Sequence, residues 1–201
     1  MTTTTALTVG SFGLLDEAVR PLLDELALEY SSRYGDRFGV DALREELERY
    51  PADQFAAPDG ALILLLDEGA AVAGGAFRLR AEPELGDPER LTRPGTRDAD
   101  GLPTVRTAEY KRIWTHSAHR RRGLSRRVLA ELEARAVAAG YERIYLTTGP
   151  RQPEAAALYL ATGFTPLFDT AADPEEIGPL AFEKWLCTDP PPSRPSLTAS
   201  E

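Results

Sequence analysis

The strongest constraint on the fold is a strand, a turn and a helix that follow one another directly. Thr107–Thr115 has the pattern of a β-strand, and after a basic turn the apolar residues recur at the spacing of one helix face. These apolar positions are Leu124, Val128, Leu129, Leu132 and Ala136. Gly140 then marks the end of the helix. The segment therefore predicts a domain of the α/β class.

Shorter elements on both sides of this segment extend the pattern. Further strands are expected at residues 6–9, 61–66, 71–78, 144–147, 164–168 and 180–186. Further helices are expected at residues 15–30, 41–50 and 153–163, the last with Gln152 as its cap and Pro153 in its first position. The order of these elements indicates an α/β domain built on a mixed sheet.

One domain is expected to occupy residues 1–187. The 201 residues are 42% hydrophobic and 27% charged, an ordinary globular balance. Residues 80–104 are rich in proline, glycine and charge without periodicity, which predicts a long exposed loop. Residues 188–201 contain four prolines and little apolar content, which predicts a disordered tail.

The composition also limits the cellular compartment and the classes of binding partner that can be expected. The single cysteine, Cys187, cannot form an internal disulfide, and the longest apolar run, residues 61–66, is too short to span a membrane. The threonine-rich start lacks the order of a signal peptide, so a cytoplasmic protein is expected. The net charge of −9 argues against generic binding to nucleic acid or to an anionic membrane.

Positive charge is nevertheless concentrated in one segment. Between Val105 and Arg127 eight basic residues stand against one acid, Glu109, giving a local charge of +7. The basic residues are Arg106, Lys111, Arg112, Arg120, Arg121, Arg122, Arg126 and Arg127. A solvated charged face explains scattered charges better than a cluster beside a glycine. The pattern therefore predicts one cationic site in an acidic chain.

The cationic segment has the features of an anion-binding turn. Arg120, Arg121, Arg122 and Gly123 lead directly into a helix, where unpaired backbone N–H groups and the positive end of the dipole point to one place. Gly123 permits close approach of a phosphate to the backbone, a combination that suits a pyrophosphate. The glycine patterns of dinucleotide-binding and P-loop proteins are absent from the sequence.

These residues resemble the GNAT acyltransferase superfamily. Its signature Arg/Gln-x-x-Gly-x-Gly/Ala is similar to Arg120-x-x-Gly123-x-Ser125, with serine at the last small position. Residues 108–115 look like the family's fourth strand, and residues 155–164 look like its closing helix and Gly-Phe turn. The resemblance covers about residues 71–186. It implies a GNAT-type, mainly antiparallel central sheet of about six to seven strands flanked by about four helices.

The resemblance also implies a binding site for acetyl-coenzyme A as cosubstrate. The turn would hold the pyrophosphate through Arg120, Arg121, Arg122, Gly123, Leu124 and Ser125. The strand edge at Ile113, Trp114 and Thr115 would pair with the pantetheine arm. Gln152 stands where many relatives have an asparagine that contacts this arm, so the amide is retained.

Two further residues are candidates for proton transfer. Glu109 matches a glutamate that acts as base in some relatives, and strand alternation places it on one face with Lys111, Ile113 and Thr115. The alternative is a structural ion pair with an arginine. Tyr159 stands where the family has the tyrosine that protonates the departing thiolate, the alternative being a core tyrosine.

Other chemistries find less support in the sequence. His116 and His119 have no carboxylate or cysteine partner at ligand spacing, so no metal is expected. We expect direct acetyl transfer from acetyl-coenzyme A to a primary amine by a monomer or homodimer, with a small-molecule acceptor favoured over a protein. The alternatives are a non-catalytic acyl-coenzyme A sensor and an RNA-acetylating toxin, of which the second fits poorly with the net charge.

Overall fold

The computed structural model describes residues 7–35, 50–80, 97, 101 and 105–186. The chain divides into two compact units, Met1–Arg80 with Ala108–Gly140, and Ala81–Thr107 with Tyr141–Glu201. Almost all of the helix expected at residues 41–50 and of the loop expected at 80–104 lies outside the described residues. The expected tail and Cys187 also lie outside them.

The first unit contains four antiparallel strands in chain order. They are β1 (Thr8–Ser11), β2 (Ala61–Asp67), β3 (Ala70–Leu79) and β4 (Thr107–Thr115). A tight turn joins β2 to β3 through Glu68 and Gly69, which have φ angles of 52° and 86°. Two successive positive φ angles match the twist of a two-residue hairpin, and they join the strands expected at residues 61–66 and 71–78.

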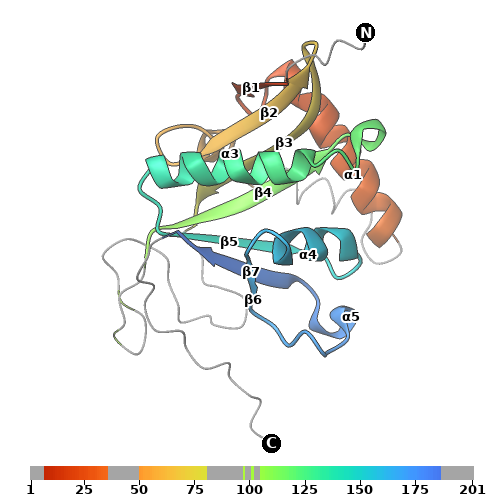
Figure 1. Ribbon diagram of the computed structural model, residues 1–201, viewed down its shortest axis with the longest axis vertical. Helices are drawn as coiled ribbons and strands as arrows, with labels where there is room; N and C mark the ends of the chain where they lie inside the picture. Colours follow the sequence, from red (N-terminus) through yellow and green to blue (C-terminus); the bar gives the residue numbers. More distant parts are fainter. Residues whose placement is uncertain (1–6, 36–49, 81–96, 98–100, 102–104, 187–201) are drawn as a thin grey trace, which may run out of the picture. The chain divides into compact units, whose positions relative to one another are not determined.

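Two helices cover opposite faces of these strands. The short 3₁₀ helix η1 (Glu17–Val19) leads into α1 (Arg20–Tyr34), and α3 (Leu124–Ala138) crosses β2 and β3 (Figure 1). A Cβ on Gly74 would lie 3.0 Å from Leu22 Cδ1 of α1. A Cβ on the next residue, Gly75, would lie 3.1 Å from Leu132 Cδ1 of α3. Because neighbouring strand residues point to opposite faces, α1 and α3 lie on opposite sides of β3.

A β-bulge interrupts β4 beside these glycines. Gly74 pairs with Trp114 and Ala76 pairs with Lys111, so two steps along β3 correspond to three along β4. The extra residue lies at Arg112, whose φ of 58° is in the left-handed region. One added residue reverses the alternation of side chains beyond it. The bulge therefore decides which β4 side chains face α1 and which face α3.

The expected grouping of β4 side chains is corrected by this bulge. Glu109 and Lys111 share the α1 face with Trp114, not with Ile113 and Thr115. Ile113 lies instead toward α3, since its Cδ1 would be 2.7 Å from a Cβ built on Gly75. Regular alternation failed as a guide because it assumes an uninterrupted strand.

The second unit has a smaller antiparallel arrangement. Its strands are β5 (Arg143–Thr148), β7 (Leu180–Trp185) and β6 (Thr165–Pro166), with β7 paired to both of the others. Its helices are α4 (Pro153–Leu160) and the single turn α5 (Pro174–Ile177). The strands of both units give the described residues the expected α/β class, with seven mainly antiparallel strands.

Short 3₁₀ segments complete the described elements, namely η2 (Ala52–Phe55) before β2 and η3 (Ser117–His119) after β4. Over the described ranges, no helix has both the length and the apolar character needed to cross a bilayer.

Candidate active site

The turn between β4 and α3 has the backbone expected of an anion site. After η3 the chain is extended at Arg120, left-handed at Arg121 with φ 62°, and left-handed again at Gly123 with φ 75°. Gly123 is the N-cap of α3, and a Cβ built on it would meet nothing within 4 Å. The first N–H groups of α3 have no helical carbonyl to bind. The backbone here is open to an approaching group.

The arginines of the turn are exposed and form only surface contacts. Arg120 Nη2 lies 3.0 Å from Glu29 Oε2, and the Arg120 side chain is 50% exposed. Arg122 Nη2 lies 3.5 Å from Asp67 Oδ2, and its Nη1 donates to His119 Nδ1 at 2.6 Å. Exposed ion pairs contribute at most about 1 kcal/mol, so an incoming phosphate can displace them.

A hydroxyl contact closes the two ends of the turn. Thr115 Oγ1, at the end of β4, lies 2.9 Å from Ser125 Oγ in the first turn of α3. Leu124 is buried and anchors the start of the helix. The serine at the last position of the signature thus has a local role, since it joins the strand to the helix across the turn.

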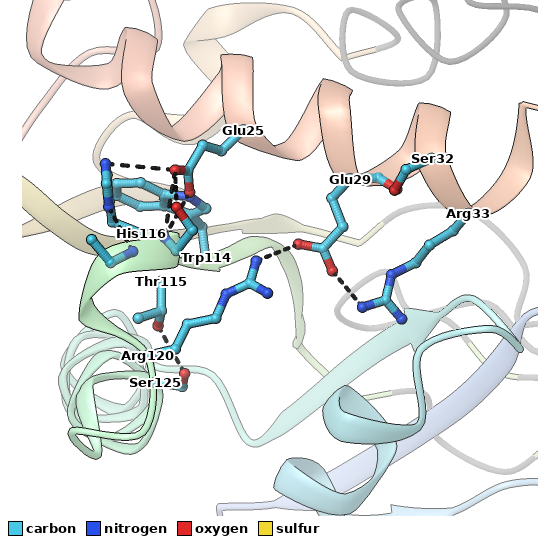
Figure 2. A network of polar contacts seen from close by, with 11 residues as sticks. Glu25, Glu29, Ser32, Arg33, Trp114, Thr115, His116, Arg120 and Ser125 are labelled. Carbon is cyan, nitrogen blue, oxygen red and sulfur yellow. Dashed lines mark hydrogen bonds and ion pairs between the residues drawn. The ribbon is translucent and has the colours of Figure 1, made fainter.

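Trp114 points away from α3 and forms part of a polar network with α1. Its indole is buried, and its Nε1–H donates to Glu25 Oε2 at 2.9 Å (Figure 2). Glu25 also accepts hydrogen bonds from Ser117, at 3.1 Å from the backbone N and at 2.9 Å from Oγ. Any contact of Trp114 with a pantetheine arm would therefore come from its backbone.

Glu25 was not found by sequence reasoning. It belongs to no motif, although an acid near Leu22 and Leu26 on an amphipathic helix was the available signal. Burial would raise the pKa of the Glu25 carboxyl, but the hydrogen bonds from Trp114 and Ser117 and the nearby His116 outweigh it. Its pKa is consequently below the ordinary value of 4.5.

Glu109 is surrounded by cations. Its carboxylate lies 2.5 Å from Arg78 Nη2, 3.1 Å from Arg80 Nη1 and 3.0 Å from Lys111 Nζ. The Glu109 side chain is 3% exposed, and the Tyr50 ring lies 3.8 Å from the Arg78 guanidinium carbon. These contacts agree with the ion-pair alternative, because both oxygens already accept charge-assisted hydrogen bonds.

The remaining two candidates belong to the second unit. Tyr159 is buried, with ring centroids 5.6 Å from both Phe164 and Phe182. Gln152 precedes α4 and uses its amide oxygen locally, accepting from Thr148 Oγ1 and from the Gly149 backbone N, each at 3.0 Å. The Gln152 side chain thus orders the turn that begins α4.

The two histidines lie within the turn network. His116 Nδ1 accepts from the Ala118 backbone N at 3.2 Å, and its Nε2 lies 3.5 Å from Glu25 Oε1. The His116 and His119 rings contact edge to face. Within the part of the chain that the structure describes, no three His, Cys, Asp or Glu side chains are grouped so as to hold a metal ion.

Comparison with known proteins identifies the family. Residues 22–164 match the model of the acetyltransferase (GNAT) family, which is well over half of the chain. The chain belongs to the GNAT acetyltransferase family. No curated protein matches the sequence at a significant level.

Solved structures share the fold. A Klebsiella pneumoniae protein named as a candidate acyl-CoA N-acyltransferase is 22% identical, with a TM-score of 0.58 over 92% of this chain and 100% of that chain. The PaiA N-acetyltransferase of Thermoplasma acidophilum, in complex with coenzyme A, is 11% identical, with a TM-score of 0.59 over 90% and 99%. YncA of Salmonella typhimurium, a candidate acetyltransferase with its cofactor acetyl-CoA, is 16% identical, with a TM-score of 0.54 over 94% and 98%. At these identities the likeness concerns the fold alone.

The two roles considered for Glu109 make different predictions for Glu109→Gln. If the ion pairs are its main role, the variant removes the anion that two buried arginines, Arg78 and Arg80, share with the partly exposed Lys111. The free energy of unfolding should then fall by about 3–5 kcal/mol in urea titrations. Asp24→Asn, at an exposed acid of α1, is the control and should unfold like wild type. An unchanged unfolding midpoint with lost turnover would instead assign Glu109 the base role.

The lowered pKa of Glu25 predicts a pH-dependent stability. A depressed pKa in the folded state stabilises the protein above the unfolded pKa, and this contribution is lost as the pH falls through the folded value. Wild type should therefore exceed Glu25→Gln in unfolding free energy at pH 7, and the difference should shrink below about pH 4. Urea titrations at both pH values check this. A difference that stays constant with pH would contradict the lowered pKa.

Proposed function

We propose that this protein binds acetyl-coenzyme A and transfers its acetyl group directly to a primary amine of a small molecule. One observation carries the proposal. The left-handed Gly123 opens a helix N-terminus beside three exposed arginines, in a chain of the GNAT family. An acidic protein with such a turn can concentrate a polyanionic cosubstrate at one place.

The coenzyme would bind through backbone and side chains together. N–H groups at the start of α3 would bind the pyrophosphate, and Arg120, Arg121 and Arg122 would add charge-assisted contacts. The backbone of residues 113–115 would pair with the pantetheine arm. The two structures described above with coenzyme A or acetyl-CoA support this cosubstrate, because they share the fold.

The transfer step requires a neutral amine and a protonated leaving group. The amine nitrogen attacks the thioester carbonyl carbon, a C–N bond forms, and the C–S bond breaks. The amine nitrogen gives one proton to solvent water, and the departing thiolate takes one from the Tyr159 hydroxyl, which solvent water then reprotonates. Of the two roles considered for Glu109, its contacts favour the ion pair, because both of its oxygens already contact cationic side chains.

The glycine at the phosphate turn has a matched control at the other end of α3. Gly123 and Gly140 have φ angles of 75° and 77°, and a Cβ on either would meet nothing within 4 Å. Alanine should cost about 1–2 kcal/mol of stability at each position. Only Gly123→Ala should also weaken acetyl-coenzyme A binding, by about tenfold in calorimetry, since its Cβ obstructs the pyrophosphate. Equal affinities for the two variants would refute the placement of the pyrophosphate.

The assignment of Tyr159 is tested by Tyr159→Phe. The variant keeps the ring packed between Phe164 and Phe182, so stability should change little, while loss of the hydroxyl should lower kcat about 100-fold. Tyr145→Phe, at a fully buried tyrosine of β5, is the control for losing a hydroxyl in the same unit. A mass-spectrometric screen of amines with acetyl-coenzyme A first supplies the acceptor.

The same experiments separate the enzyme from a sensor. An unchanged kcat in Tyr159→Phe would make Tyr159 a core residue. Tight binding of acetyl-coenzyme A with no acetylated product from any amine would favour the acyl-coenzyme A sensor.

A further inference from the structure

We infer that Glu25 of α1 is a positioning residue that holds the phosphate-binding turn in its coenzyme-binding shape. The inference rests on the proposed function, in which the turn at residues 116–123 receives the pyrophosphate. Glu25 would not touch the coenzyme itself. It would act through Trp114 and Ser117, which precede and begin the turn.

The contacts of Glu25 converge from two neighbouring parts of the chain. Its carboxylate accepts from Trp114 Nε1 at 2.9 Å, from the Ser117 backbone N at 3.1 Å and from Ser117 Oγ at 2.9 Å. The first donor comes from the end of β4, and the other two come from the first residue of η3 (Figure 2). One carboxylate thus fixes the direction in which the chain leaves the strand.

The turn needs such support because its own bonds are few. Among the described residues its backbone bonds outside helices and strands are His116 N to Val72 O at 2.9 Å, His119 N to His116 O at 2.8 Å and Arg127 N to Gly123 O at 3.3 Å. Arg121 is left-handed, a conformation that costs a non-glycine residue about 1–2 kcal/mol. Ordering such an exposed segment also costs conformational entropy. Hydrogen bonds to the packed helix α1 reduce the conformational entropy that the turn would otherwise lose when the coenzyme binds.

Glu29 extends the same support by one helical turn. Its carboxylate lies 3.0 Å from Arg120 Nη2, at the middle of the turn. Glu25 and Glu29 are four residues apart and therefore lie on one side of α1. Two acids on one side of α1 thereby contact the turn, Glu25 at its beginning and Glu29 at its middle.

The direction in which the coenzyme affinity changes when Glu25 is replaced distinguishes a positioning role from simple charge repulsion. A negative charge near a phosphate site repels the phosphate, so removal of the Glu25 charge alone would tighten coenzyme binding. If Glu25 positions the turn, its replacement should weaken coenzyme binding instead. Glutamine cannot replace Glu25, because Trp114 and Ser117 together donate three hydrogen bonds, and an amide offers one acceptor oxygen beside a competing NH₂ donor.

The experiment compares Glu25→Gln with Asp24→Asn. Both remove one negative charge from adjacent positions of α1, but Asp24 is exposed, and within the described part of the chain no hydrogen bond or ion pair joins it to the turn. Calorimetry with acetyl-coenzyme A should give a Kd about tenfold higher for Glu25→Gln than for Asp24→Asn, at a temperature where both are folded. An equal or lower Kd for Glu25→Gln would overturn the inference. Failure of wild type to bind acetyl-coenzyme A would instead overturn the proposed function.

Two further measurements keep the inference testable on its own. Hydrogen exchange of the unliganded proteins should be faster in Glu25→Gln than in Asp24→Asn, and the increase should be larger for peptides covering residues 116–123 than for peptides of α3. The lower unfolding free energy of Glu25→Gln can raise exchange everywhere, so an increase of the same size along the whole chain would contradict a positioning role. Ser117→Ala, at an exposed residue that loses one of the three contacts, should raise the Kd by a smaller factor. If neither Ser117→Ala nor Glu25→Gln changed the Kd, the positioning role of Glu25 would be refuted.

Discussion

The extra residue in β4 is the constraint on which the arrangement of the candidate site depends. With Arg112 in a left-handed conformation, Trp114 and Thr115 exchange the faces that a regular strand would give them. Trp114 therefore reaches Glu25 on α1, and Thr115 reaches Ser125 on α3. Without the bulge each side chain would lie on the wrong side of the sheet for its partner.

The turn between β4 and α3, the candidate anion site, is consequently held from both faces of the first unit. One hydroxyl contact joins its ends on the α3 side, and a carboxylate holds its beginning on the α1 side. The arginines between these points remain at the surface. A rigid frame with exposed cations suits a ligand whose phosphates must be fixed while its other end is presented for reaction.

Local signals in the sequence sufficed to predict part of this arrangement. The strand at Thr107–Thr115, the helix that follows and the glycine turn between them depend on neighbouring residues, and all three are present. The cations around Glu109 could not be assigned in advance, because Arg78 and Arg80 meet it only through the pairing of β3 with β4. The Glu25 contacts depend on helix packing over about 90 residues of sequence, which no local pattern encodes.

Glu29 is shared between two arginines, and this sharing bears on how the turn can move. Arg33, on the same helix, lies 3.1 Å from one carboxylate oxygen of Glu29, and Arg120 lies 3.0 Å from the other. If the ion pair between Arg120 and Glu29 breaks, Glu29 still has the ion pair with Arg33. The turn arginine can thus exchange partners without leaving an isolated charge behind, which lowers the barrier to capturing and releasing an anion.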